Sequence, residues 1–154
     1  MICGIATAAK HLKPSIDIFA SEIETAAPLA AAFEHGEVTK ISMSKSWVDG
    51  IGSGSVLNEM WPLVQSCVDS SIVVTLKETG AALKLLIENN HFICEGASAT
   101  SLAAALWHYQ NQVNQGRAAL RRTDSSDRPL KIVAVLSGGG IDNDTIIKCL
   151  QDSL

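Results

Sequence analysis

The stretch Lys131-Ile-Val-Ala-Val-Leu-Ser-Gly-Gly-Gly-Ile-Asp142 decides the fold class, because an apolar, β-branched run gives way to one hydroxyl and three glycines. A continuous apolar run is typical of a strand that is buried on both faces of a parallel sheet. Open α/β sheets bind ligands at the carboxyl ends of their strands, where glycines let the backbone approach a ligand closely. The stretch therefore predicts a strand, a ligand-facing turn and a following helix. A glycine turn that only reverses the chain is the alternative interpretation.

Helices and strands alternate along the rest of the sequence. Helical spacing covers about residues 2–11, 25–33, 56–68, 77–88 and a region that opens at Gly96, whereas residues 16–21 and 71–76 have strand patterns. This alternation predicts the α/β class, with a three-layer architecture in which helices flank a mostly parallel sheet.

Composition limits the classes of partner. The 154 residues suit one domain, and 47% of them are hydrophobic, with a mean hydropathy of +0.20. This apolar content predicts that the chain buries surface against something else, either as a homo-oligomer or against a missing part of its own fold. The net charge of −4, without a dominant cluster of Lys or Arg, argues against nucleic acid as a partner.

The sequence also predicts a cytoplasmic location without membrane insertion. No basic segment followed by a long apolar run opens the chain, and no run approaches the length of a membrane span. The four cysteines, Cys3, Cys67, Cys94 and Cys149, are scattered and lack metal-ligand spacing. Reduced, partly buried thiols are the expected state.

Three ordered segments resemble the C-terminal half of the fold-type-II pyridoxal-phosphate enzymes, in the threonine/serine dehydratase and serine racemase group. They are Gly4-Ile-Ala with Leu12-Lys-Pro-Ser and Phe19-Ala-Ser-Glu22, then Trp47-Val-Asp-Gly-Ile51, then Glu95-Gly-Ala with Ala103-Ala-Ala-Leu106 and Leu136-Ser-Gly-Gly-Gly-Ile-Asp142. The resemblance covers nearly the whole chain and implies a partial tryptophan-synthase-β-like fold. It also implies pyridoxal 5'-phosphate as cofactor and a small amino acid as substrate.

The resemblance implies a role for five residues at the cofactor. Ser137 matches the residue that hydrogen-bonds the pyridine nitrogen, where a neutral hydroxyl suits β-elimination because it leaves the ring unprotonated. Gly138 and Gly139 match positions around the ring edge, Gly50 matches a loop that closes over one ring face, and Glu95 matches an acidic residue near the ring. Without the resemblance, Ser137 reads as a helix cap, Gly50 as part of an Asp-Gly turn and Glu95 as a surface residue at a helix start.

The resemblance also implies a site for a divalent cation, Mg²⁺ or Ca²⁺. Glu22 matches its carboxylate ligand and Ala26 offers a backbone carbonyl. Such hard cations need several oxygen ligands, and Pro28 replaces the second acidic ligand expected just after Ala26. This replacement argues against a complete cation site.

The family's covalent chemistry uses a lysine in a Ser-x-Lys-x-Arg-like segment, together with a glycine-rich phosphate loop, and this sequence has neither. Residues 1–154 are therefore expected to form the C-terminal part of a pyridoxal-phosphate-dependent enzyme domain without its upstream lysine-bearing part. The complete enzyme would be a lyase that converts a hydroxy amino acid by β-elimination to a 2-oxo acid and ammonia. This chain alone would be inactive, with no catalytic residue of its own. The alternatives are a non-catalytic module that pairs with a full-length homologue, and a serine racemase or β-replacement activity.

Overall fold

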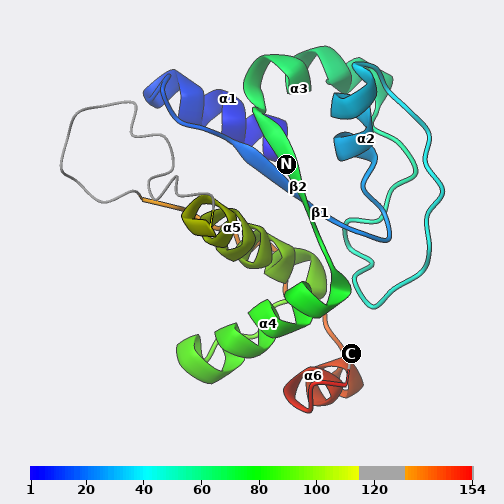
Figure 1. Ribbon diagram of the computed structural model, residues 1–154, viewed down its shortest axis with the longest axis vertical. Helices are drawn as coiled ribbons and strands as arrows, with labels where there is room; N and C mark the ends of the chain where they lie inside the picture. The colour runs from blue at the N-terminus through cyan, green and yellow to red at the C-terminus, as the bar shows by residue number, and fades with distance from the viewer. Residues whose placement is uncertain (115–130, 154) are drawn as a thin grey trace. The chain divides into compact units, whose positions relative to one another are not determined.

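The computed structural model describes residues 1–114 and 131–153, and these form two compact units, Met1–Thr75 and Leu76–Leu154. The first unit contains α1 (Ile2–Leu12), β1 (Phe19–Ile23), α2 (Pro28–His35), the 3-10 helix η1 (Asn58–Met60), α3 (Trp61–Cys67) and β2 (Ser70–Val74). The second contains α4 (Leu76–Asn90), α5 (Gly96–Asn114) and α6 (Asn143–Leu150). Helices flank a parallel sheet, so the predicted α/β class is confirmed (Figure 1).

The sheet of the first unit consists of the parallel strands β1 and β2. Phe19 lies opposite Ser70 and Ile23 opposite Val74. Parallel neighbours need a long crossover connection, and here that connection carries α2, η1 and α3. Figure 1 shows α1, α2 and α3 gathered around the two strands. The apolar core of this unit joins α1, β1, α2 and α3. Its buried residues are Cys3, Ala6, Ala20, Leu29, Ala32, Trp61, Val64, Cys67 and Val68.

Glu22 of β1 joins the strand to both α2 and β2. Its carboxylate accepts hydrogen bonds from the backbone N–H groups of Leu29 (2.8 Å) and Ala30 (2.7 Å), and from the hydroxyl of Ser71 (2.7 Å). The N-cap residue of α2, Ala27, has no side chain that can accept these bonds. A carboxylate at a helix N-terminus satisfies free N–H groups and interacts favourably with the helix dipole. Glu22 therefore caps α2 from the neighbouring strand.

The predicted helix over 25–33 begins only at Pro28, because the proline ring suits the first helical turn and lacks the N–H that would otherwise need a partner. Pro62 has the same effect at the start of α3, so the helical spacing predicted over 56–68 is divided between η1 and α3. The predicted helix starting at residue 2 and the predicted strand over 71–76 are observed within a few residues of their expected bounds.

The prediction of a strand over 131–136 is wrong, because this segment is irregular in the structure. The segment has no strand neighbour among the described residues, and Ile132, Val133 and Val135 are 47%, 82% and 42% exposed. A strand is stabilised by inter-strand hydrogen bonds, so an apolar run without such a neighbour stays irregular. The carbonyl of Val135 instead accepts a hydrogen bond from the Ser101 hydroxyl of α5 (3.0 Å).

The helix predicted after the glycine turn is present as α6, and Asp142 caps it. The Asp142 carboxylate accepts from the backbone N–H of Thr145 (2.8 Å) and from its hydroxyl (2.7 Å), which together lower the pKa of Asp142. At its other end α6 is tied to α4, because Cys149 Sγ donates to the carbonyl of Gly80 and Lys84 pairs with Asp152. None of the helices in the described ranges is both long and apolar enough to cross a membrane.

We predict that Glu22→Gln lowers the free energy of unfolding by roughly 2 kcal/mol, because one carboxylate oxygen that accepts from buried donors becomes an amide nitrogen. Urea unfolding monitored by circular dichroism measures this loss. Glu34→Gln on the exposed side of α2 is the matched control and leaves stability unchanged. Equal stability of the two variants would contradict the capping role.

We predict that the cap of α6 weakens in acid. Because the folded-state pKa of Asp142 lies below its ordinary value of 3.8, the cap contributes stability above that value and loses it as the pH falls through the lowered pKa. Protection of the Thr145 amide from hydrogen exchange should fall over this range in the native chain. Asp142→Asn keeps an N-cap oxygen that does not titrate, so its protection should change less. Identical acid profiles would count against this cap.

Candidate cofactor-ring site

The turn Ser137–Gly140 of the second unit is fastened to the start of α5. The carbonyl of Gly138 accepts hydrogen bonds from the backbone N–H of Glu95 (3.1 Å) and from the hydroxyl of Ser98 (3.0 Å). The Ser98 hydroxyl also accepts from the N–H groups of Ser137 (3.1 Å) and Gly138 (2.7 Å). Both ends of the Gly138 residue are thereby bonded to residues at the start of α5, and the turn has a defined conformation.

The position of the Glu95 carboxylate depends on Gly138 being a glycine. A Cβ placed on its backbone would collide with the carboxylate group of Glu95. A Cβ on Gly139 would meet no atom within 4 Å. The first glycine therefore permits a close approach of Glu95 to the turn, whereas the second leaves open space beside it.

Glu95 contributes a side-chain contact as well as its backbone N–H. Its Oε2 accepts from the N–H of Gly140 at 3.2 Å, so the carboxylate lies along the turn from Gly138 to Gly140. The preceding residue, Cys94, is fully buried, and burial is the main cause that raises the pKa of its thiol. Glu95 thus lies between the buried residue Cys94 and the glycine turn.

Ser137 has a fixed backbone and an exposed side chain. Its N–H is held by Ser98, while no described residue makes a hydrogen bond with its hydroxyl. A serine hydroxyl can donate one hydrogen bond and accept two, so this group is available to a ligand. The structure therefore brings together four of the five residues predicted at the cofactor ring, namely Glu95, Ser137, Gly138 and Gly139.

The fifth predicted residue, Gly50, lies in the loop of the first unit that precedes η1. The loop is anchored at Val48, whose N–H and carbonyl both bond the Ser46 hydroxyl, at 3.3 and 3.2 Å. Gly50 follows in an exposed turn in which Gly52 N–H donates to the Asp49 carbonyl (3.3 Å). In the same loop the indole nitrogen of Trp47 is buried and has no hydrogen-bond partner among the described residues. A buried donor of this kind is costly unless a further group supplies an acceptor.

The predicted cation ligands do not form a metal centre. Glu22 is buried and its two oxygens already accept three hydrogen bonds, and the N–H of Ala26 donates to Ile23. Within residues 1–114 and 131–153, no group of three His, Cys, Asp or Glu side chains could hold a metal ion. The donor set that is present therefore does not fit Mg²⁺ or Ca²⁺, which require several oxygen ligands.

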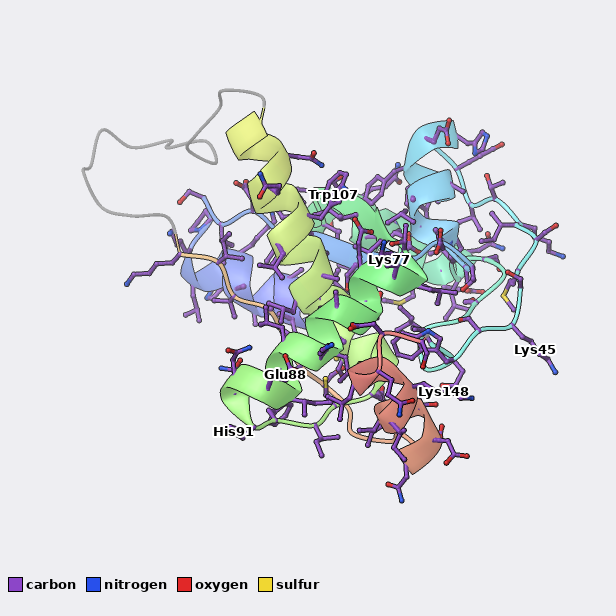
Figure 2. All side chains as sticks on the ribbon, turned by 60° about the horizontal axis from the view of Figure 1, so that its bottom comes forward. Lys45, Lys77, Glu88, His91, Trp107 and Lys148 are labelled. Atoms are coloured by element: carbon purple, nitrogen blue, oxygen red, sulfur yellow. The ribbon has the colours of Figure 1, made fainter. Side chains whose placement is uncertain are left out.

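A cavity of about 120 Å³ lies elsewhere in the second unit, lined by Lys77, Gly80, Ala81, Cys149 and Asp152. Figure 2 shows Lys77 on the first part of α4 and Lys148 on α6. None of the residues predicted at the cofactor ring lines this cavity. All four cysteines are buried and free, and burial is the leading cause of the raised pKa of Cys149.

Comparison with known proteins identifies the family. The family model described as pyridoxal-phosphate dependent enzyme matches residues 1–123. The chain belongs to this family. It is 32% identical to the L-threonine ammonia-lyase of Geobacter sulfurreducens over 154 residues, which is 100% of this chain and 35% of that protein. It is 31% identical to the serine racemase of Rattus norvegicus over 143 residues, which is 92% of this chain and 39% of that protein.

The solved structure of maize serine racemase matches with a TM-score of 0.77 and 29% sequence identity, over 99% of this chain and 45% of that one. These matches confirm the family resemblance, the fold class and pyridoxal phosphate as the family's cofactor. The chain thus spans less than half the length of these relatives.

Ser98 is the residue of this site that sequence reasoning missed. The run Gly96-Ala-Ser-Ala-Thr-Ser did predict a helix start, and hydroxyls in a first turn commonly bond nearby backbone groups. Nothing in the local sequence indicated that the partner of Ser98 lies some 40 positions further along the chain.

We predict that Gly138→Ala lowers the free energy of unfolding by about 0.5–1.5 kcal/mol, because its methyl group displaces the Glu95 carboxylate and breaks the bond of that carboxylate to the N–H of Gly140. Gly139→Ala, which adds the same methyl group in open space, should change it by less than about 0.5 kcal/mol. Urea unfolding of the two variants measures both values. Adding Glu95→Ala to Gly138→Ala should cost less than the sum of the single changes, since it removes the collision. Strict additivity would contradict the contact.

Proposed function

We propose that this chain is the ring-binding, C-terminal part of a pyridoxal-phosphate-dependent threonine or serine dehydratase. In the complete enzyme the reaction would be β-elimination of a hydroxy amino acid to a 2-oxo acid and ammonia. The observation that carries the proposal is the exposed Ser137 hydroxyl on a glycine turn whose backbone is fixed to α5. The likeness to an L-threonine ammonia-lyase over the full chain supports the reaction class.

The residues of the turn fit one end of pyridoxal phosphate. A planar ring needs a surface without projecting side chains, and the space beside Gly139 is open, whereas the Glu95 carboxylate lies beside Gly138. The ring nitrogen needs a donor, which the Ser137 hydroxyl would provide. When bound, the cofactor supplies an electron sink for charge that develops at the substrate Cα. Because the Ser137 hydroxyl is neutral, it would donate to the ring nitrogen without protonating it. Glu95 would orient the turn through its bond to Gly140.

By the family resemblance, the Gly50 loop would lie against one face of the ring, and the buried indole N–H of Trp47 in that loop has no hydrogen-bond partner among the described residues. A lysine-bearing part that precedes these residues would supply the covalent chemistry, and a homo-oligomer in the cytoplasm would be the assembled form. Exposed apolar side chains such as Val133 and Phe92 support such association.

Serine racemisation is the second candidate, favoured by the 31% identity to a serine racemase. A neutral donor to the ring nitrogen does not by itself separate elimination from racemisation. A non-catalytic module that pairs with a full-length homologue would share the fold but not the activity. The reading frame upstream separates this last alternative, because a Ser-x-Lys-x-Arg segment followed by a glycine-rich loop there would support an enzyme.

We predict that the purified 154-residue chain, supplied with pyridoxal phosphate, releases no ammonia from L-serine or L-threonine. The reason is that none of its lysines lies in a Ser-x-Lys-x-Arg segment. Borohydride reduction followed by mass spectrometry should accordingly find no single, stoichiometrically modified lysine. Lys77 and Lys148 are the positions to inspect in the second unit, and Lys45 in the first (Figure 2). Ammonia release together with one specifically modified lysine would contradict the proposal.

A further inference from the structure

Ser98 occupies an unusual position for a polar side chain. It is only 1% exposed, yet it lies in the first turn of α5 and faces the glycine turn rather than its own helix. Its hydroxyl donates to Gly138 O and accepts from Ser137 N and Gly138 N. One donor and two acceptor positions are all that a hydroxyl has, so its hydrogen-bonding capacity is fully used on two consecutive residues.

This arrangement determines which part of Ser137 is fixed and which part is available. The N–H of Ser137 is bonded to Ser98, whereas its hydroxyl has no partner among the described residues. The three glycines that follow Ser137 restrict the backbone little by themselves, since glycine has the widest conformational freedom. A defined direction for the Ser137 hydroxyl therefore has to come from contacts outside the turn.

Three residues supply such contacts, but only one of them bonds Ser137 itself. Glu95 bonds the carbonyl of Gly138 and the N–H of Gly140, which lie after Ser137 in the chain. Ser101 bonds the carbonyl of Val135, two residues before Ser137. Of Glu95, Ser98 and Ser101, only Ser98 bonds the N–H of Ser137 itself.

We propose that Ser98 is the positioning residue of the ring-nitrogen contact: its buried hydroxyl fixes the Ser137–Gly138 backbone and so aims the Ser137 hydroxyl at the ring. This role deepens the proposed function and rests on it. Loss of the Ser98 hydroxyl leaves two backbone donors without their acceptor, which loosens the turn without removing any group that would touch the ring.

The first test is amide hydrogen exchange, followed by nuclear magnetic resonance on the ligand-free chain. In Ser98→Ala the amides of Ser137 and Gly138 should exchange on the order of tenfold faster than in the native chain. The matched control is Ser101→Ala, which removes a hydroxyl from the same helix and a bond to the same segment, at Val135. It should leave these two amides unchanged. Equal exchange at Ser137 and Gly138 in Ser98→Ala and the native chain would overturn the proposal.

The native chain also provides a test that needs no variant and so does not depend on whether a variant folds. If Ser98 holds them, the amides of Ser137 and Gly138 are protected from exchange although Ser137 is exposed. Exchange of both at the rate of an unstructured peptide would overturn the proposal without any substitution.

The second test uses pyridoxamine 5'-phosphate as the probe, because it carries the cofactor ring but no aldehyde to react with lysines. Ser98→Ala should weaken its binding about tenfold, whereas Ser101→Ala should leave the affinity unchanged and Ser98→Thr, which keeps the hydroxyl, should restore most of it. Faster exchange in Ser98→Ala with unchanged affinity would overturn the positioning role. No binding by the native chain would instead contradict the proposed function, while the exchange rates would still decide whether Ser98 fixes the turn.

Discussion

The hydrogen bonds of Gly138 to the start of α5 are the constraint on which the candidate site depends. The segment that leads into the turn has no strand neighbour among the described residues, so a sheet does not hold it. Instead, Ser98 and the backbone of Glu95 bond Gly138, and the absence of a Cβ lets the Glu95 carboxylate lie against it. A single glycine thereby joins the turn to the helix. Its fixed geometry gives the exposed hydroxyl of Ser137 a defined place.

In the first unit a similar principle operates through Glu22. The strand that carries it would expose a carboxylate to an apolar environment, and α2 would begin with free N–H groups. Three hydrogen bonds satisfy both requirements at once. The residue that the family resemblance assigns to a cation is thus explained by capping, because the oxygens that would bind an ion already accept from protein donors.

The sequence allowed the α/β class, the parallel strands and most helix positions to be predicted, since apolar spacing and prolines are local signals. It also indicated Ser137, Gly138, Gly139 and Glu95, which the structure brings together. The strand over 131–136 could not be judged locally, because strand formation depends on a neighbour elsewhere in the protein. The role of Ser98 was equally hidden, since its partners lie about 40 residues away and a buried serine in an alanine-rich helix start looks like ordinary packing. The capping by Glu22 depends on bonds to Leu29 and Ala30, seven and eight residues further along the chain, which periodicity does not reveal.

The central claim is that the turn Ser137–Gly140 binds the pyridine ring of the cofactor. The most direct test is a titration of the isotope-labelled chain with pyridoxamine 5'-phosphate, followed through the backbone amide resonances. The account predicts saturable shifts in the second unit, concentrated at Glu95 and at Ser137 to Gly140. It also predicts that Ser137→Ala abolishes these shifts. Saturable shifts confined instead to the cavity lined by Lys77 and Cys149, or no saturable shifts at all, would contradict it.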